Sequence, residues 1–156
     1  MNPCESLGAM LQARHLKLAV AESCTGGLLG AALTGVPGAS NWFAGGVIAY
    51  ANSVKTGLLG VQEATLAQHG AVSKETVLQM ASGACKTLGA EVGLSISGIA
   101  GPDGGTLEKP VGTVWIGYCV QGRADAERYH FTGDREEVRA QAAATALLGL
   151  RKRVEM

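Results

Sequence analysis

The chain has 156 residues, of which 47% are hydrophobic and 17% are charged, and its 13 basic and 13 acidic residues give a formal net charge of zero. The length suits a single domain over residues 1–156. The zero net charge argues against binding to nucleic acid and favours a homo-oligomer, because charge repulsion between copies is weak.

Apolar spacing in the first half of the chain predicts strands that alternate with helices. In chain order we expect a helix at 4–15, a strand at 18–20, a helix at 28–33, a strand at 42–50, and helices at 62–69 and 73–88. The strand at 42–50 leads into a segment that carries Tyr50 and Lys55 at the end of the strand. The helix at 73–88 begins at Ser73, whose side chain can cap it, and it ends at Gly89.

The second half of the chain predicts three more strands and a long helix. These are strands at 92–98, 113–120 and 126–131, and a helix at 135–151. Residues 121–123 form a hairpin-like turn, so part of the sheet is expected to be antiparallel. The element order predicts an α/β fold, a three-layer α/β/α sandwich with a mixed, mostly parallel sheet.

Cysteine spacing and the N-terminal residues exclude several kinds of site and segment. The four cysteines form no CxxC pair, so no metal site is predicted. Polar residues interrupt the stretch 1–17, which argues against a secretory signal or a membrane-spanning segment. We therefore expect a cytoplasmic protein that does not associate with membranes.

Ser23 is the best candidate nucleophile, because it follows an apolar strand and precedes the glycines that open the next helix. Open α/β sheets bind ligands beyond the carboxyl ends of their strands, and free N–H groups of the following helix can hold a phosphate or an oxyanion. The alternative is a capped turn without chemistry. Cys24 is a rival nucleophile, but adjacent residues of an extended segment point in opposite directions, so only one of the two should face the crevice.

A serine nucleophile needs a base, and Lys55 is better placed than any histidine. None of the three histidines follows an apolar strand beside a glycine-rich loop. Burial lowers the pKa of a lysine toward the range in which it can remove a serine proton. We predict a Ser23–Lys55 dyad, with Tyr50 either orienting the proton or packing with its hydroxyl in water.

Two further features suit an anionic ligand. The loop 98–105 contains four glycines, which can present backbone N–H groups to an anion, although a rigid turn without a ligand is the alternative. Arg135 and Arg139 begin the last helix and can bind a phosphate, or can simply be solvated. Neither a G-x-G-x-x-G helix opening nor a P-loop is present, so no nucleotide cofactor is predicted.

Several segments together resemble a known family over nearly the whole chain and in the same order. They are residues 21–27, 46–52 with Lys55, 95–105, 109–114 and 133–139. The sequence is similar to the CinA C-terminal domain family of nicotinamide-nucleotide amidohydrolases. The resemblance implies a CinA-like fold. It also implies hydrolysis of the carboxamide of nicotinamide mononucleotide to nicotinic acid mononucleotide and ammonia, a pyridine-nucleotide recycling reaction without a cofactor.

The resemblance also implies roles for individual residues. Ser23 is expected to be the nucleophile, Lys55 the base and Tyr50 an assisting hydroxyl, with a backbone N–H near residues 25–27 at the oxyanion. We expect the phosphate to lie on glycine-loop N–H groups with Arg135 or Arg139. The predicted substrate-binding residues are Thr25, Gly26, Gly27, Gly98, Gly101, Gly105, Arg135 and Arg139.

The sequence departs from the family pattern near the proposed base. Positions 51 and 53 hold Ala and Ser, where many relatives carry a hydroxyl residue and an acid, so the neighbours that tune the pKa of Lys55 differ. Two other functions remain open. One is a non-catalytic nucleotide-binding or interaction module linked to competence or DNA damage, and the other is an amidase with a different substrate.

Overall fold

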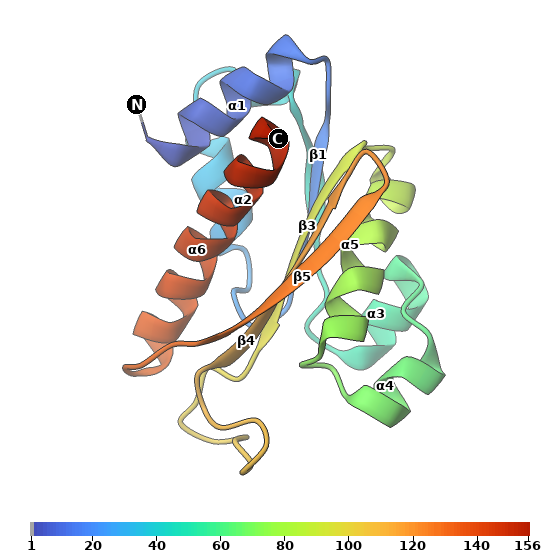
Figure 1. Ribbon diagram of the computed structural model, residues 1–156, viewed down its shortest axis with the longest axis vertical. Helices are drawn as coiled ribbons and strands as arrows, with labels where there is room; N and C mark the ends of the chain where they lie inside the picture. Colours follow the sequence, from blue (N-terminus) through green and yellow to red (C-terminus); the bar gives the residue numbers. More distant parts are fainter. Residues whose placement is uncertain (1) are drawn as a thin grey trace.

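A five-stranded mixed sheet forms the centre of the computed structural model, which describes residues 2–156 (Figure 1). Met1, the first residue of the predicted domain, lies outside the described residues. In the order in which they lie side by side, the strands are β2 (Phe43–Ile48), β1 (Leu18–Glu22), β3 (Val92–Gly98), β4 (Thr113–Val120) and β5 (Arg123–His130). β1 is parallel to β2 and β3, whereas β4 is antiparallel to β3 and β5. Only β4 therefore runs against the other strands, and the predicted mixed sheet is confirmed.

Helices cover both faces of this sheet (Figure 1). One face carries α1 (Pro3–Ala13), α2 (Leu28–Thr34) and α6 (Arg135–Glu155). The other carries α3 (Asn52–Leu59), α4 (Glu63–His69) and α5 (Lys74–Leu88). A short 3₁₀ turn, Ala39–Asn41, precedes β2. The predicted α/β/α sandwich is confirmed.

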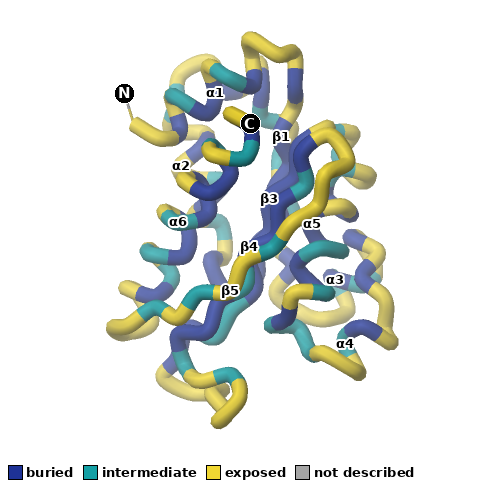
Figure 2. Tube along the Cα trace, in the orientation of Figure 1, coloured by how far each residue is buried: buried dark blue, intermediate teal, exposed yellow. Residues whose placement is uncertain are grey.

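The alternating side chains of the central strands supply two separate cores. Leu18 and Val20 of β1 belong to the core under α1, α2 and α6, whereas Ala19 and Ala21 belong to the core under α5. The strand β1 is buried along its whole length, while β5 is largely exposed (Figure 2). The carboxyl ends of β1 and β3 are therefore enclosed by protein on both faces of the sheet.

The helix α3 is not predicted by the sequence pattern, in which Lys55 belongs to the end of a strand. Local signals for this helix are weak: Ala51 at its N-cap makes no side-chain hydrogen bond, and β-branched residues and a glycine lie inside it. Its packing against α5 supplies the stabilisation that the sequence does not reveal. Lys55 is thus a helical residue, which is a correction to the prediction.

The hairpin between β4 and β5 is tighter than predicted. The backbone has positive φ angles of 50° at Gln121 and 84° at Gly122, so these two residues make the turn, as in type I′ hairpins. The strand β5 consequently begins at Arg123 and ends at His130, instead of spanning 126–131.

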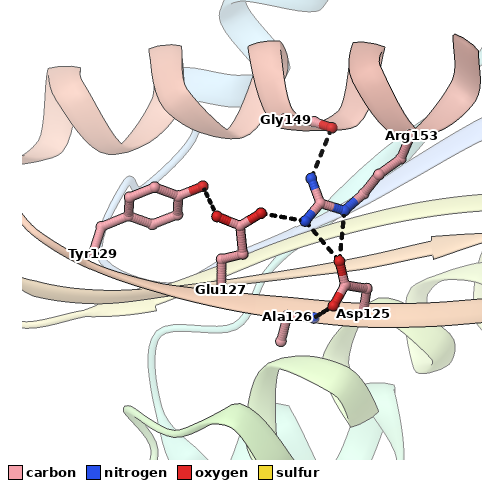
Figure 3. Close-up of polar contacts among 6 residues, drawn as sticks. All are labelled: Asp125, Ala126, Glu127, Tyr129, Gly149 and Arg153. Carbon is pink, nitrogen blue, oxygen red and sulfur yellow. Dashed lines mark hydrogen bonds and ion pairs between the residues drawn. The ribbon is translucent and has the colours of Figure 1, made fainter.

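The C-terminal part of α6 is fixed to β5 through Arg153 (Figure 3). Its guanidinium donates to Asp125 Oδ2 at 2.6 and 2.9 Å and to the Gly149 carbonyl at 3.0 Å, and it also contacts Glu127. It lies 3.7 Å from the centre of the Tyr118 ring. This cluster ties the last helix to the exposed edge of the sheet.

Candidate active site

Ser23 and Lys55 lie in contact at the carboxyl end of β1. The distance between Lys55 Nζ and Ser23 Oγ is 3.2 Å. Ser23 is the first residue after β1, and its N–H donates to the Ile96 carbonyl at 3.0 Å, which continues the pairing with β3. Both side chains are buried, with exposed fractions of 8% for Ser23 and 1% for Lys55. The structure thus brings together the two residues that the sequence predicted as a dyad.

The surroundings of Lys55 favour loss of the proton from its amine relative to an exposed lysine. Its Nζ lies 2.8 Å from the Ala49 carbonyl and 3.1 Å from the Tyr50 carbonyl, and no carboxylate among residues 2–156 forms an ion pair with it. Burial lowers the pKa of Lys55. A neutral amine has two N–H groups and one lone pair, so the two carbonyls can accept the N–H groups while the lone pair faces the Ser23 hydroxyl. This arrangement can take up the Ser23 proton.

Cys24 is directed away from the dyad. Its side chain is buried in the core on the opposite face of the sheet, and burial raises the pKa of its thiol to about 11. A thiol of such high pKa supplies little thiolate, which is the nucleophilic form. Ser23 and Cys24 therefore lie on opposite faces of the sheet, as the alternation of an extended segment predicts.

The turn after Ser23 is organised by Glu22, a buried carboxylate that the sequence analysis did not select. Glu22 accepts hydrogen bonds from Thr25 Oγ1 at 2.7 Å and from the N–H groups of Gly27, Leu29 and Gly30 at 3.2, 2.9 and 3.0 Å. The N–H groups that open α2 are therefore not free for a phosphate or an oxyanion, which is a correction to the prediction. An acidic residue just ahead of a helix start is the signal that could have identified it.

The predicted binding residues of the turn are largely occupied within it. The Thr25 hydroxyl and the Gly27 N–H serve Glu22, and the Gly26 N–H donates to the Ser23 carbonyl at 3.2 Å. Gly26 and Gly27 have φ angles of 57° and 116°, which side-chain-bearing residues rarely adopt. In this turn, the N–H groups of Cys24 and Thr25 are the backbone donors that find no acceptor among residues 2–156. Of the predicted residues 25–27, the Thr25 N–H is therefore the remaining candidate for an oxyanion donor.

Arg139 reaches from α6 across the same turn. Its Nε donates to the Cys24 carbonyl at 2.9 Å and its Nη2 to the Thr25 carbonyl at 3.2 Å. A Cβ atom at Gly26 would lie 3.3 Å from Arg139 Nη2, so the glycine also makes room for this side chain. Arg139 therefore binds the Ser23 turn directly, and its remaining N–H groups are available to a ligand.

Arg135 links the loop after β3 to Tyr50, which follows β2. It donates to the Gly101 carbonyl at 2.8 Å and to the Tyr50 hydroxyl at 3.3 Å. With Arg139 it lines a surface hollow of about 400 Å³, whose other lining residues are Leu28, Glu136 and Ala140. The structure thus brings both arginines close to the turn that carries Ser23, as the prediction of a common site requires.

The Tyr50 side chain does not touch the dyad. Its hydroxyl accepts a hydrogen bond from Arg135, and the residue is 63% exposed. Its main-chain carbonyl, by contrast, is one of the two that hold the Lys55 amine. Tyr50 is therefore part of the site through its backbone, and its hydroxyl belongs to the arginine side of the site.

The predicted glycines at the end of β3 and in the loop after it allow close packing against Val111 and Val114. Cβ atoms at Gly101 and Gly105 would lie 2.5 Å and 2.7 Å from atoms of Val111, and one at Gly98 would lie 2.6 Å from Val114 Cγ2. Gly101 also has a φ of 85°. These contacts favour the rigid-turn interpretation, with the Gly101 carbonyl as an anchor for Arg135.

Two further features concern the chain as a whole. Within residues 2–156, no group of three or more His, Cys, Asp and Glu side chains is arranged to hold a metal ion. None of the helices in that part of the chain is both long and apolar enough to cross a membrane.

Solved structures share the fold that positions this site. A CinA superfamily protein from Klebsiella pneumoniae superposes with a TM-score of 0.92 and 38% sequence identity, with 99% of each chain covered. A competence/damage inducible protein from Agrobacterium tumefaciens superposes with a TM-score of 0.90 and 36% identity, covering 100% of this chain and 98% of the other. The architecture is therefore shared over its full extent.

Sequence relatives and a family description point the same way. A protein of Enterobacter agglomerans named nicotinamide-nucleotide amidohydrolase PncC is 51% identical over 142 residues, which cover 90% of this chain and 87% of the relative. The protein of the same name from Escherichia coli K12 is 49% identical, covering 94% and 90%. The family model of the CinA C-terminal domain matches residues 2–154. With the Ser23 turn, Lys55 and the two arginines all within that match, the chain belongs to the CinA C-terminal domain family.

Proposed function

We propose that the protein hydrolyses the carboxamide of nicotinamide mononucleotide to nicotinic acid mononucleotide and ammonia, through a Ser/Lys mechanism. The observation that carries this proposal is the buried contact between Lys55 Nζ and Ser23 Oγ. Relatives of about half identity over nine tenths of the chain are named for an amidohydrolase activity on nicotinamide nucleotides. The chemistry of the site and the names of the relatives therefore support the same reaction.

The proposed reaction proceeds by acyl transfer. Ser23 Oγ attacks the carboxamide carbon while its proton moves to Lys55 Nζ, and the carbonyl oxygen becomes an oxyanion. The C–N bond then breaks, Lys55 returns the proton to the leaving nitrogen, and ammonia departs. Water attacks the ester on Ser23 with Lys55 again as the base, which releases the acid and restores the serine. No cofactor is needed for these steps.

Substrate orientation follows from the charges around the dyad. Arg135 and Arg139 border the hollow beside the Ser23 turn and retain N–H donors beyond those they give to carbonyls. A guanidinium binds phosphate oxygens well, and two of them suit the 5′-phosphate of a mononucleotide. The carboxamide would then lie at Ser23 while the phosphate lies at the start of α6.

We also retain the prediction of a homo-oligomer. The edge strand β2 has the sequence FAGGVI without a charged side chain, whereas the opposite edge β5 reads RADAERYH. Charged residues protect an exposed edge against pairing with another copy, and β2 lacks them. Light scattering during size-exclusion chromatography would determine the mass in solution. A cytoplasmic location and the absence of nucleic-acid binding remain predictions from the sequence.

Ammonia release from nicotinamide mononucleotide tests the proposed function. The wild-type protein should release ammonia without an added cofactor, and Ser23→Ala should not. Ser40→Ala is a matched control, because Ser40 is exposed and lies in the turn before β2, away from the carboxyl end of β1. Activity on other amides but not on the mononucleotide would indicate a different amidase. A folded wild-type protein that binds the nucleotide without turnover would indicate a binding module.

A further inference from the structure

A second serine, Ser97, lies beside Ser23 on the neighbouring strand. Glu22 of β1 pairs with Ile96 of β3, and the Ser23 N–H donates to the Ile96 carbonyl at 3.0 Å. The parallel register therefore places Ser97 next to Ser23. Adjacent strands are about 4.8 Å apart, so a single small group can contact both hydroxyls.

The two serine side chains also share a face of the sheet. Ser95, two residues before Ser97, pairs with Ala21 and donates from its hydroxyl to the Val77 carbonyl of α5 at 2.6 Å. Side chains along a strand alternate, so Ser97 points to the same side as Ser95, and Ser23 to the same side as Ala21. That side is the one from which Lys55 approaches.

The Ser97 hydroxyl is buried but uncommitted. Ser97 is 2% exposed, yet its hydroxyl forms no hydrogen bond within residues 2–156, whereas the Ser95 hydroxyl does. The fully enclosed side-chain polar atoms without a partner in that part of the chain are Tyr118 Oη and Arg151 Nε. The Ser97 hydroxyl is not one of them, so part of its surface remains accessible.

We propose that Ser97 is a further catalytic residue, whose hydroxyl donates a hydrogen bond to the oxyanion that forms when Ser23 attacks a carbonyl carbon. The inference rests on the proposed function in one respect, the identity of the natural substrate. The Ser97 proton stays on its oxygen throughout, so no additional acid or base is needed. An unpaired backbone N–H of the Ser23 turn, that of Cys24 or of Thr25, is the second donor, and together the two would replace the helix N–H groups that Glu22 occupies. A hydroxyl or amide that donates to the oxyanion strongly increases the rate of acyl transfer.

The test compares Ser97→Ala with the wild type in two assays. One assay measures turnover of nicotinamide mononucleotide. The other measures acetylation of Ser23 by p-nitrophenyl acetate, with nitrophenolate release as the readout. Mass spectrometry confirms that the acetyl group is on Ser23. Both kcat and the acetylation rate should fall about a hundredfold, with KM unchanged. The pH at which kcat/KM levels off should stay the same, because Lys55 is untouched.

Matched variants separate this role from a loss of structure. Ser95→Ala removes a buried hydroxyl from the same strand and face, and should lower the melting temperature without slowing acetylation. Should Ser97→Ala fail to fold, Ser97→Cys keeps the shape with a weaker donor and should also slow both reactions. A wild-type acetylation rate in a folded Ser97 variant would overturn the inference.

The ester assay distinguishes this inference from the proposed function. If the wild type is acetylated at Ser23 but leaves nicotinamide mononucleotide intact, the substrate proposal fails, and a slow Ser97→Ala acetylation still supports the oxyanion role. If neither reagent reacts at Ser23, the serine is not a nucleophile, and the role of Ser97 falls with it.

Discussion

The Lys55 amine lies 3.2 Å from Ser23 Oγ and is held by the carbonyls of Ala49 and Tyr50. Because these carbonyls belong to the main chain, the position of the amine does not depend on a neighbouring acid. The departure of residues 51 and 53 from the family pattern therefore leaves the Ser23–Lys55 contact intact. Desolvation, rather than an ionic partner, is what lowers the pKa of Lys55.

The pH dependence of turnover should report the Lys55 amine. A base acts when deprotonated, so kcat/KM should rise with pH and level off once Lys55 is neutral. Since burial lowers its pKa, the plateau should begin below about 10.4, the value of an unperturbed lysine. Lys55→Arg cannot serve as a base and should lose about a thousandfold in kcat. A profile that is flat with pH, or an active Lys55→Arg, would contradict the role.

Replacement of Glu22 by Gln should weaken both the turn and the reaction. Each oxygen of the Glu22 carboxylate accepts from a backbone N–H group of α2. In glutamine, an NH₂ group replaces one of these oxygens, so two donors would face each other. We expect the free energy of unfolding in urea to fall by about 1–3 kcal/mol and the rate of Ser23 acylation to fall about tenfold. Glu5→Gln, at an exposed position of α1, is the matched control. Unchanged stability in Glu22→Gln would refute the assignment.

Two substitutions at Tyr50 separate its hydroxyl from its ring. Tyr50→Phe should keep most of kcat, because the hydroxyl lies on Arg135 and the carbonyl that holds Lys55 is retained. Tyr50→Leu also removes the exposed ring, which can stack on the cationic pyridinium of the substrate, and should raise KM. A large loss of kcat in Tyr50→Phe would show instead that the hydroxyl assists the dyad during turnover.

The arginines at the start of α6 should matter for phosphorylated substrates. Arg135→Ala is expected to raise KM for nicotinamide mononucleotide about tenfold to a hundredfold, because a charge-assisted contact is worth about 1.5–3 kcal/mol. Nicotinamide riboside, which lacks the phosphate, should be affected much less. Arg123→Ala, at the exposed start of β5, serves as the control. Equal effects on both substrates would assign Arg135 a role in shaping the loop instead.

The Arg153 cluster should make stability depend on acid. Contact with Arg153 lowers the pKa values of Asp125 and Glu127 in the folded protein. The two carboxylates therefore add to the free energy of unfolding above their unfolded-state pKa values of about 4. This added stability is lost as pH falls through the lower folded-state pKa values. Both carboxylates are about half exposed, so the effect should not exceed about 1 kcal/mol. Arg153→Leu should flatten the fall in melting temperature between about pH 5 and pH 2. An unchanged slope would contradict this account.

Local patterns were sufficient for most of the elements but not for α3. The predicted strand at 92–98 coincides with β3, because its apolar run and bounding turns are local signals. The helix α3 has neither a side-chain cap nor a strong helix-forming sequence, and its stability comes from contacts with α5 that are distant in sequence. Lys55 was therefore selected for its residue type and chain position, while its helical setting was not foreseen.

The sequence by itself determined that a serine ends a buried strand before a glycine-opened helix, because strand burial and glycine turns depend on neighbouring residues. It also identified Lys55, Arg135 and Arg139 as the charged groups suited to that serine. Only the tertiary structure decided that Glu22 occupies the start of α2 and that Ser97 lies beside Ser23. Strand register and the direction of a buried side chain depend on which segments pack together, and this information is not contained in any short stretch of the chain.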